Sequence, residues 1–540
     1  MIKKIFLNYI VPLLAGCFYA FGFPLKEIPL LFFAPMLGVF VVCYGINLFD
    51  LTVRKVDLKK DLLRIFLFSL GGCFLGYNWV PETLRIFGDI VFPFNYMLGS
   101  LASFIILPQF FALIFTLYFY SFIKQKRILD FLMKPLSLAL LMVLFEEFLP
   151  QIFPTHLGHP YLIFAPYLGL APYGGVPLFS LLSFWAIFEI LKFIRTKKIN
   201  KWIFLPISFF ILLNIIMPLR FNPEEGKGLQ LRLAQVNIES YLKLASEKGN
   251  SDAVREVFGN YVELSLRPSE KPIDLLIWPE TAYPYTVESK LWKNTGKALP
   301  TLFIQIGQKT RADLVWGGYE VAASTNENDF ETTYNALFHF AYTDVGMIFN
   351  DVYHKIRLIP FGETLPFGPL NPFLGSVIRN ISYFKKGEDF KSFTTRKESR
   401  FISVICYEIL FSSFVREYLN KVEKPPHFLI NLTNDSWYGD TNEPLQHLFL
   451  AKWRALEYDL PIVRSTNSGI SSILYPDGSE SARLPYGVKD ILDLELKLKE
   501  RTPTIYERFG LWITMGVWFI LSLIFSVRWK NLRAINREDE

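Results

Sequence analysis

Histidine and cysteine are scarce in this sequence, which contains six of the first and four of the second among 540 residues. Neither occurs at the spacing typical of metal ligands, so the sequence predicts no metal site and no cofactor. Cys17, Cys43 and Cys73 lie within apolar runs, where a cysteine usually serves only to pack. Cys406 is the one cysteine in the more polar region that follows. It is therefore the only candidate thiol nucleophile in that region, and no disulfide can form within it.

Charged residues are also few, at 20% of the sequence, whereas hydrophobic residues make up 51%. A soluble enzyme of this length would be less apolar. The net charge of +6 is modest, and the basic residues flank apolar runs instead of forming one continuous basic region. This pattern excludes nucleic acid as an expected partner and favours a protein that works among membrane lipids.

The apolar residues are concentrated in runs long enough to cross a bilayer, for which about 20 residues are needed. Seven such runs come first and an eighth lies near the C-terminus, at about residues 5–23, 28–48, 62–79, 96–119, 132–153, 178–194, 202–218 and 511–527. The sequence therefore predicts an α-helical membrane bundle of about eight spans. Its parts are a seven-span domain at 1–220, a C-terminal transmembrane helix at 508–528 and a cytoplasmic basic tail at 529–540.

Clusters of lysine and arginine predict the orientation of this bundle. They lie at residues 3–4, 54–64, 124–127, 195–201 and 528–537, and eight crossings place all of them on one side. Because cytoplasmic loops carry the excess of basic residues, we expect both termini in the cytoplasm and residues 225–505 outside it. A transporter would be expected to carry ionisable residues at mid-span, whereas Glu146 and Glu147 lie near a span end.

Residues 225–505 alternate between expected strands and expected helices. Strands are predicted at 229–238, 273–278, 314–319, 336–342, 401–405, 428–432, 461–465 and 471–475, and helices at 252–266 and 447–458. Strands that alternate with helices favour an α/β sandwich. We expect this region to be an extracytoplasmic catalytic domain.

Glu280, Lys355 and Cys406 each follow a strand-like segment, the position at which functional residues gather in α/β proteins. A cysteine attacks as its thiolate, which is a minor species at neutral pH unless a base and a cation favour it. Glu280 is the candidate base, and Lys355 is the candidate cation for the thiolate and then for an oxyanion. The backbone N–H of Tyr407 is placed to donate to the same oxyanion. Each residue taken singly is more often structural, so the hypothesis depends on their combination.

Three motifs around these residues resemble those of the nitrilase superfamily and, within it, of the apolipoprotein N-acyltransferases. They are LIWPET at 276–281, YHKIRLIPFGE at 353–363 and SVICYE at 403–408. Further matching segments are NLTNDSWYG at 431–439, QH at 446–447, RALE at 454–457 and RSTNSG at 464–469. The resemblance extends over nearly the whole chain, because this family also has seven spans before the catalytic domain and one after it.

The resemblance implies a nitrilase-like α-β-β-α sandwich that is joined to the membrane bundle, in a monomer of the bacterial cytoplasmic (inner) membrane with the catalytic domain on the periplasmic side. It implies that Cys406 takes an acyl chain from a phospholipid as a thioester. The chain then passes to the α-amine of the diacylglyceryl-cysteine of an apolipoprotein, which completes lipoprotein maturation. Glu280 would act as base in both halves.

The resemblance also assigns supporting roles to Glu363, Tyr407 and Glu408, and Glu363 is expected to hold Lys355. Candidates for substrate binding are Asn335, Trp437, Tyr438 and Arg464, although Trp437 and Tyr438 could instead be interfacial anchors. For Glu408 the equally weighted alternative is a buried ion pair with Arg464 or Arg454.

Two other functions stay open on the sequence. The same glutamate, lysine and cysteine would serve a membrane-tethered amidase or nitrilase-type hydrolase, with water as the acceptor. A non-catalytic protein that binds lipids or acts as a scaffold would not need Cys406. The three functions differ in what happens to the acyl group.

Overall fold

A computed structural model of the chain describes residues 5–46, 57–88, 90–99, 135–149, 151–198, 201–224, 226–247, 249–294, 299–322, 332–365, 367–371 and 383–538. The chain divides into two compact units. The first comprises residues 1–81, 92–219 and 504–540, and the second comprises residues 82–91 and 220–503. Each unit has its own internal packing.

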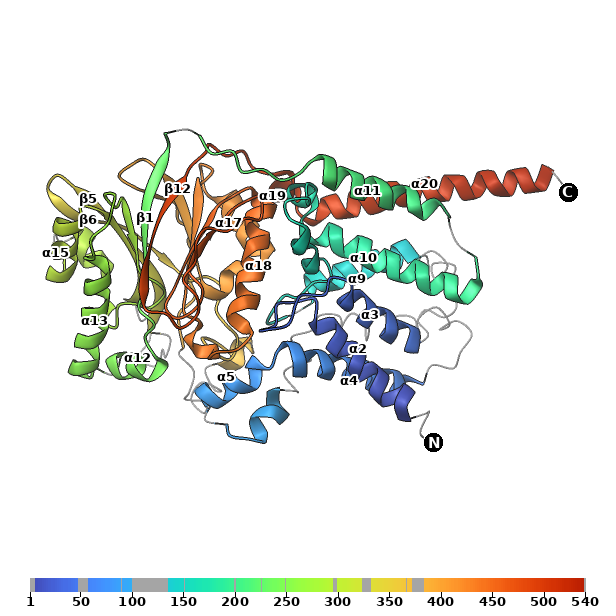
Figure 1. Ribbon diagram of the computed structural model, residues 1–540, viewed down its shortest axis with the longest axis horizontal. Helices are drawn as coiled ribbons and strands as arrows, with labels where there is room; N and C mark the ends of the chain where they lie inside the picture. The colour runs from blue at the N-terminus through green and yellow to red at the C-terminus, as the bar shows by residue number, and fades with distance from the viewer. Residues whose placement is uncertain are drawn as a thin grey trace. The chain divides into compact units, whose positions relative to one another are not determined.

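The first unit is helical (Figure 1). A π-helical turn, Phe6–Ile10, precedes α2, and the other helices are α2 (Val11–Ala20), α3 (Ala34–Gly45), α4 (Leu58–Gly76), α9 (Pro135–Phe148), α10 (Ala171–Thr196), α11 (Phe204–Ile216), α19 (Ile505–Phe509) and α20 (Leu511–Glu538). Helices occur at seven of the eight expected spans, and most of the fourth, at 96–119, lies outside the described residues.

Most of these helices are too short to cross a membrane by themselves. In the described part of the chain, only α10 is by itself both long enough and apolar enough to cross a membrane. Lys59–Gly76 and Trp79–Ile86, the latter within α5 (Trp79–Gly88), meet these conditions together as a pair bent by 70°. A helix of 12 residues such as α3 is only about 18 Å long, against a hydrocarbon core of about 30 Å. The helix lengths therefore do not confirm eight spans.

The acidic pair near the end of α9 has local partners. The Glu146 carboxylate accepts a hydrogen bond from the Leu157 backbone N–H at 2.9 Å. Glu147 forms an ion pair with His156 at 3.3 Å. Both carboxylates thus contact the segment that directly follows α9.

The second unit is a sandwich of two β-sheets covered by helices. One sheet has the strand order β12-β1-β2-β4-β5-β6, with β3 paired to β4, and the other has the order β11-β10-β9-β8-β7. Figure 1 shows α13 (Ser251–Ser265) and α15 (Thr301–Thr310) outside the first sheet, and α17 (Ser412–Lys421) and α18 (Glu443–Tyr458) outside the second. The predicted α-β-β-α architecture is therefore confirmed.

The strands are as follows: β1 (Gly228–Gln235), β2 (Leu275–Ile277), β3 (Thr286–Val287), β4 (Asp313–Val321), β5 (Thr333–Thr343), β6 (Gly346–His354), β7 (Phe393–Thr394), β8 (Arg400–Ile405), β9 (Phe428–Thr433), β10 (Ile462–Thr466), β11 (Ser472–Leu474) and β12 (Asp490–Lys497). Each predicted strand has a counterpart among them. Four strands were not predicted: β6 and β12, whose residues are largely half-buried or exposed and so lack a continuous apolar run, and the two-residue strands β3 and β7.

Aromatic side chains form much of the core behind the first sheet. The rings of Trp316 and Phe338 stack with centroids 4.3 Å apart, and Phe303 stacks on Trp316 at 5.0 Å. Trp278 stacks on Tyr261 at 4.7 Å and donates from its indole N–H to the Ser265 hydroxyl at 2.9 Å. This packing fixes the end of β2, from which the 278–281 turn leaves the sheet.

The direction of the strands brings several loops to the same edge. Strand β2 is parallel to β4, while β5 is antiparallel to both β4 and β6, so β2, β4 and β6 run the same way. In the second sheet β8, β9 and β10 are parallel. Residues that follow β2 and β6 therefore gather at one edge of their sheet, and those that follow β8, β9 and β10 gather at one edge of the other.

Gly317, in the middle of β4, allows the 278–281 turn to lie directly against the sheet. A Cβ atom at this position would stand 2.6 Å from the Glu280 Cα and 2.6 Å from the Pro279 carbonyl oxygen. The Gly317 backbone N–H donates to that oxygen at 3.1 Å. The contact is backbone against backbone, so no side chain can move aside to make room.

We expect Gly317→Ala to destabilise the protein, because inserting a methyl group into such a contact typically costs about 1–3 kcal/mol. The matched control is Gly259→Ala, since Gly259 lies within α13 with nothing within 4 Å of the position of its Cβ. That change should be neutral or stabilising by up to about 1 kcal/mol. Thermal unfolding in detergent measures both, and equal melting temperatures for the two variants would contradict the proposed close approach.

Candidate active site

The structure brings Glu280, Lys355 and Cys406 together from the two sheets. Glu280 follows β2, Lys355 directly follows β6, and Cys406 directly follows β8. All three side chains are almost fully enclosed, with 6%, 0% and 3% of their surface exposed. Each of the three residues therefore follows a strand, as the sequence predicts.

Lys355 lies between two carboxylates. Its Nζ is 2.7 Å from Glu363 Oε1 and 3.3 Å from Glu280 Oε1. The side-chain amide of Asn335, on β5, donates to the same two oxygens, at 3.3 Å to Glu363 and 2.8 Å to Glu280. The second oxygen of Glu363 accepts from the Ile359 backbone N–H at 2.9 Å. Both Lys355 and Asn335 thus hold the two carboxylates in a fixed arrangement.

Electrostatics in this enclosed space favour a charged lysine and a neutral thiol. Burial alone would lower the pKa of Lys355, but the carboxylates of Glu363 and Glu280 outweigh it and raise the pKa. Burial raises the pKa of the Cys406 thiol well above its usual range, and Glu280 raises it further, whereas Lys355 lowers it. The thiol therefore needs a partner that takes its proton as it attacks.

Cys406 lies in a sharp turn between β8 and a 3-10 helix, Cys406–Leu410. Its φ angle of 49° is in the left-handed region, which non-glycine residues rarely adopt. His447, on α18, contacts this turn, and its Nε2 lies 3.3 Å from the Cys406 carbonyl oxygen. The nucleophile thus lies at a strained position that its surroundings maintain.

Glu408 ties this turn to the segment that follows Lys355. Its carboxylate accepts from the backbone N–H groups of Ile356 at 2.7 Å, Arg357 at 2.9 Å and Ile405 at 2.8 Å. The Tyr353 hydroxyl donates to it as well, at 2.9 Å. Burial raises the pKa of Glu408 to about 7, against the effect of the backbone donors. The alternative of an ion pair with Arg464 or Arg454 is wrong, because Glu408 binds backbone groups and Tyr353 instead.

The aromatic candidates lie in two turns, one that begins at Cys406 and one that follows β9. The Tyr407 ring packs against Phe411, with centroids 4.8 Å apart, and only 5% of Tyr407 is exposed. Trp437 and Tyr438 are half-buried in a 3-10 turn, Asp435–Tyr438, that follows β9. Burial raises the pKa of Tyr438 well above its usual range, and Cys406 and Glu280 are among the groups that raise it further. Tyr438 is therefore within electrostatic range of the site.

Arg464 is fully buried below this turn. Its guanidinium donates to Asn431 Oδ1 at 2.8 Å and to Asp435 Oδ2 at 2.8 Å. Arg454 has a different partner, Glu457, at 2.7 Å. Arg464 thus supports the loop that carries Trp437 and Tyr438, and it has no exposed atoms with which to meet a substrate.

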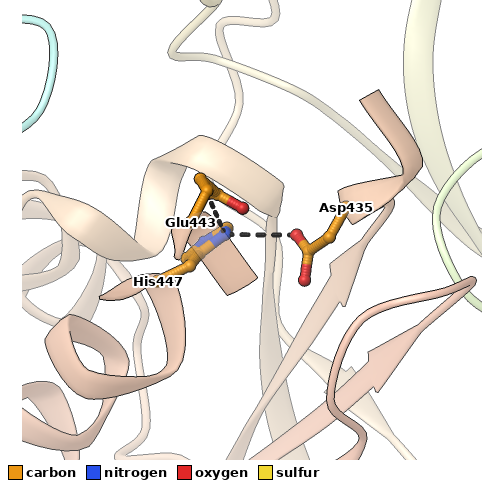
Figure 2. Close-up of side chains that lie close together, drawn as sticks. All are labelled: Asp435, Glu443 and His447. Carbon is orange, nitrogen blue, oxygen red and sulfur yellow. Dashed lines mark ion pairs between the residues drawn. The ribbon is translucent and has the colours of Figure 1, made fainter. Parts of the chain in front are cut away.

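Asp435 also belongs to a buried cluster with Glu443 and His447, shown in Figure 2. His447 Nδ1 is 3.3 Å from Asp435 Oδ1 and 3.3 Å from Glu443 Oε1. Burial raises the pKa of Glu443 to about 7, and the Asp435 carboxylate contributes to this increase. No sequence motif indicates this cluster, because Glu443 lies outside the matching segments.

Within the described ranges, these three side chains form the one group that could hold a metal ion. Their ligand atoms all lie within 4.8 Å of one another. The Arg464 guanidinium already neutralises Asp435 from the other side. Histidine and arginine together balance the two carboxylates, so the charges of the cluster need no metal ion to offset them.

A second lysine, Lys243, also reaches the site, and the sequence analysis missed it. It lies on α12 (Ser240–Glu247), is 6% exposed, and donates to the Thr281 hydroxyl next to Glu280. No local pattern distinguishes it from a surface lysine on an amphipathic helix.

Two family models match the chain. The model of the carbon-nitrogen hydrolases matches residues 232–506, and that of the apolipoprotein N-acyltransferase N-terminal domain matches residues 15–188. The chain belongs to the carbon-nitrogen hydrolases, among the apolipoprotein N-acyltransferases. This membership confirms the resemblance and the expectation of an acyltransferase.

Curated relatives match over most of the chain. The apolipoprotein N-acyltransferase of Bdellovibrio bacteriovorus is 27% identical, over 92% of this chain and 90% of its own length. That of Haemophilus influenzae is 26% identical, over 99% of this chain and 96% of its own length. Among solved structures, Saccharomyces cerevisiae Nit3 matches 50% of this chain and 90% of its own at 19% identity, with a TM-score of 0.34. An amidase from Nesterenkonia sp. matches 55% and 99% at 16% identity, with a TM-score of 0.33.

The raised pKa of Glu443 predicts a dependence of stability on pH. The folded protein binds this proton more tightly than the unfolded chain, in which the pKa is near 4.5. The free energy of unfolding should therefore fall as pH rises from about 4.5 to about 7 and level off above that range. Glu443→Gln cannot ionise and should make this part of the profile less steep, while Glu408, whose pKa burial also raises to about 7, retains part of the dependence.

Melting temperatures across this pH range, measured in detergent, test the prediction. Glu417→Gln is the matched control, because Glu417 is exposed on α17. A Glu443→Gln profile as steep as that of the wild type and of the control would show that Glu443 does not take up this proton.

Proposed function

We propose that this protein transfers a fatty acyl chain from a membrane phospholipid to the α-amine of the diacylglyceryl-cysteine of an apolipoprotein, through a thioester on Cys406. The observation that carries this proposal is the buried contact of Lys355 with Glu280 and Glu363 beside a single strained cysteine. Membership of the apolipoprotein N-acyltransferases supports the choice of donor and acceptor.

In the first half-reaction, the Cys406 sulfur attacks the ester carbonyl carbon of the phospholipid while Glu280 takes the thiol proton. The carbonyl oxygen becomes an oxyanion, which the Lys355 ammonium and the backbone N–H of Tyr407 stabilise. The bond from the carbonyl carbon to the glycerol oxygen then breaks. Glu280 returns its proton to that oxygen, and lysophospholipid leaves.

In the second half-reaction, the neutral α-amine of the acceptor attacks the thioester carbonyl and gives one proton to Glu280. The same oxyanion donors serve again. The carbon–sulfur bond breaks, an amide remains on the acceptor, and Glu280 returns the proton to the Cys406 sulfur. No metal, cofactor or redox partner takes part in this scheme.

The supporting residues act on the position of these groups. Glu363 and Asn335 fix Lys355 and Glu280, and Glu408 fixes the Cys406 turn relative to the segment that follows Lys355. Asn335 and Arg464, both candidates for substrate binding, contact protein groups instead. Trp437 and Tyr438, half-buried near Cys406, are the aromatic residues that we assign to contact with the acyl chain.

The placement in the membrane follows from the basic clusters. We assign residues 1–220 to a seven-span domain, 225–505 to the periplasmic catalytic domain, 508–528 to an eighth span and 529–540 to a cytoplasmic tail. The protein is then a monomer of the bacterial inner membrane with both termini in the cytoplasm. Both substrates are lipid-anchored, so this placement gives the catalytic domain access to both.

The fate of the acyl group separates acyl transfer from hydrolysis. We expect purified enzyme, given a phospholipid with an alkyne-labelled acyl chain, to release stoichiometric lysophospholipid and then stop. Addition of a diacylglyceryl-cysteine peptide should restart turnover and place the label on the peptide amine. The measurement is the partition of label among protein, peptide and free fatty acid.

Two controls sharpen this test. A peptide whose α-amine is acetylated should not restart turnover, and Cys406→Ala should release no lysophospholipid. Steady release of free fatty acid without acceptor would favour a membrane-tethered hydrolase. A non-catalytic lipid-binding or scaffold protein predicts instead that Cys406→Ala keeps its function in a complementation assay, and loss of function there would reject that alternative.

A further inference from the structure

Lys243 is a buried cation without an acidic partner. Its side chain reaches from α12 into the region between Glu280 and the Asp435–Tyr438 turn. None of the carboxylates in the described ranges forms an ion pair with it. Glu247, four residues further along the same helix, accepts instead from the Tyr319 hydroxyl at 2.5 Å. Enclosing an unpaired ammonium is costly, so its position calls for an explanation.

The neutral contacts of Lys243 join two loops of the active site. It donates to the hydroxyl of Thr281, which directly follows Glu280. It is 2.8 Å from the amide oxygen of Asn434, in the orientation in which that oxygen also accepts from the Trp437 indole at 3.2 Å. Its Nζ lies 5.3 Å from the centre of the Trp437 ring. These contacts direct the ammonium towards the catalytic groups instead of towards solvent.

Thr281 supports this interpretation through its backbone. Its φ angle of 47° lies in the left-handed region, which is especially unfavourable for a β-branched residue. The hydrogen bond from Lys243 holds this strained turn, and Glu280 is part of it. Lys243, Glu280 and Thr281 also line the same small cavity.

The charges around Cys406 show what a second cation would contribute. Two carboxylates, Glu280 and Glu363, and one ammonium, Lys355, contact one another and act electrostatically on Cys406, as does Asp435, whose charge Arg464 offsets. This set has a net charge of minus one, which opposes both a thiolate and an oxyanion in an enclosed space. Lys243 lies within electrostatic range of Glu280 and Cys406, and its ammonium brings the net charge to zero.

We propose that Lys243 is a positioning residue whose positive charge favours the thiolate of Cys406, in addition to the direct contacts of Lys355. This inference rests on the proposed function, in which Cys406 is the nucleophile. Burial lowers the pKa of Lys243 itself, while Glu247, Glu280 and Cys406 oppose that effect, so the ionisation of Lys243 and of Cys406 is linked.

Alkylation of Cys406 by iodoacetamide tests this role directly, because the reagent reacts with the thiolate. The rate is measured on the full chain in detergent between about pH 7 and pH 11.5, because burial raises the pKa of the thiol above its usual value of about 8.5, and the Cys406 peptide is quantified by mass spectrometry. We expect Lys243→Met and Lys243→Gln to raise the midpoint of the pH profile by about one unit or more. At neutral pH this corresponds to a rate about tenfold lower.

Three variants separate charge from contact. Lys243→Gln keeps a hydrogen-bond donor but loses the charge, whereas Lys243→Arg keeps the charge but changes the shape of the donor. If charge is decisive, the Arg variant keeps a midpoint close to that of the wild type. Lys309→Met, which removes an exposed lysine of α15, should leave the profile unchanged.

Equal midpoints in the wild type and in Lys243→Met and Lys243→Gln would overturn the proposal, even if the rates fell. Equal shifts in all three Lys243 variants would also overturn it, because contact would then matter and charge would not. Failure of the proposed function gives a different result. In that case wild-type Cys406 takes no acyl group from phospholipid at any pH, whatever its alkylation profile.

Discussion

The site depends on one buried lysine held between two carboxylates. Lys355 is fully enclosed, and Glu280 and Glu363 share its charge at 3.3 and 2.7 Å. Removing Lys355 would leave two carboxylates without a counter-charge in an enclosed place, which is strongly destabilising in proteins. Asn335 and the Ile359 backbone N–H complete the hydrogen bonds of the two carboxylates. A base and a cation are thus held in one geometry before any substrate arrives, as preorganised catalysis requires.

The two sheets contribute different parts of this arrangement. Glu280 and Lys355 come from strand ends of the first sheet, and Cys406 comes from the second. Their mutual position therefore needs bonds that cross between the sheets. Glu408 supplies them, since its carboxylate accepts from Ile356 and Arg357 after β6 and from Ile405 at the end of β8. Its position two residues after the nucleophile makes the sharp turn at Cys406 and the bridge to Lys355 parts of one structure.

The sequence is sufficient to predict the sandwich and the three strand-end residues, because buried strands show as short apolar runs and reactive residues follow them. It does not predict β6 and β12, whose side chains are only partly buried, nor the bounds of the helices of the first unit, since α2, α3 and α9 end before the apolar runs do and α10 ends after its run. It also assigns Arg464 to the substrate, although this arginine binds Asp435. The sequence does not indicate a role for Lys243 or Glu443, because the burial of these residues depends on contacts between distant segments.

The central claim is that Cys406 carries the acyl group. Peptide-level mass spectrometry of the enzyme after incubation with a phospholipid, without acceptor, tests it most directly. The account predicts one acyl mass on the peptide that contains Cys406, removed by neutral hydroxylamine as expected for a thioester, and no acyl mass on the Cys406→Ala variant. An acyl mass on a peptide that does not contain Cys406, or equal acylation of the wild type and of Cys406→Ala, would contradict the account.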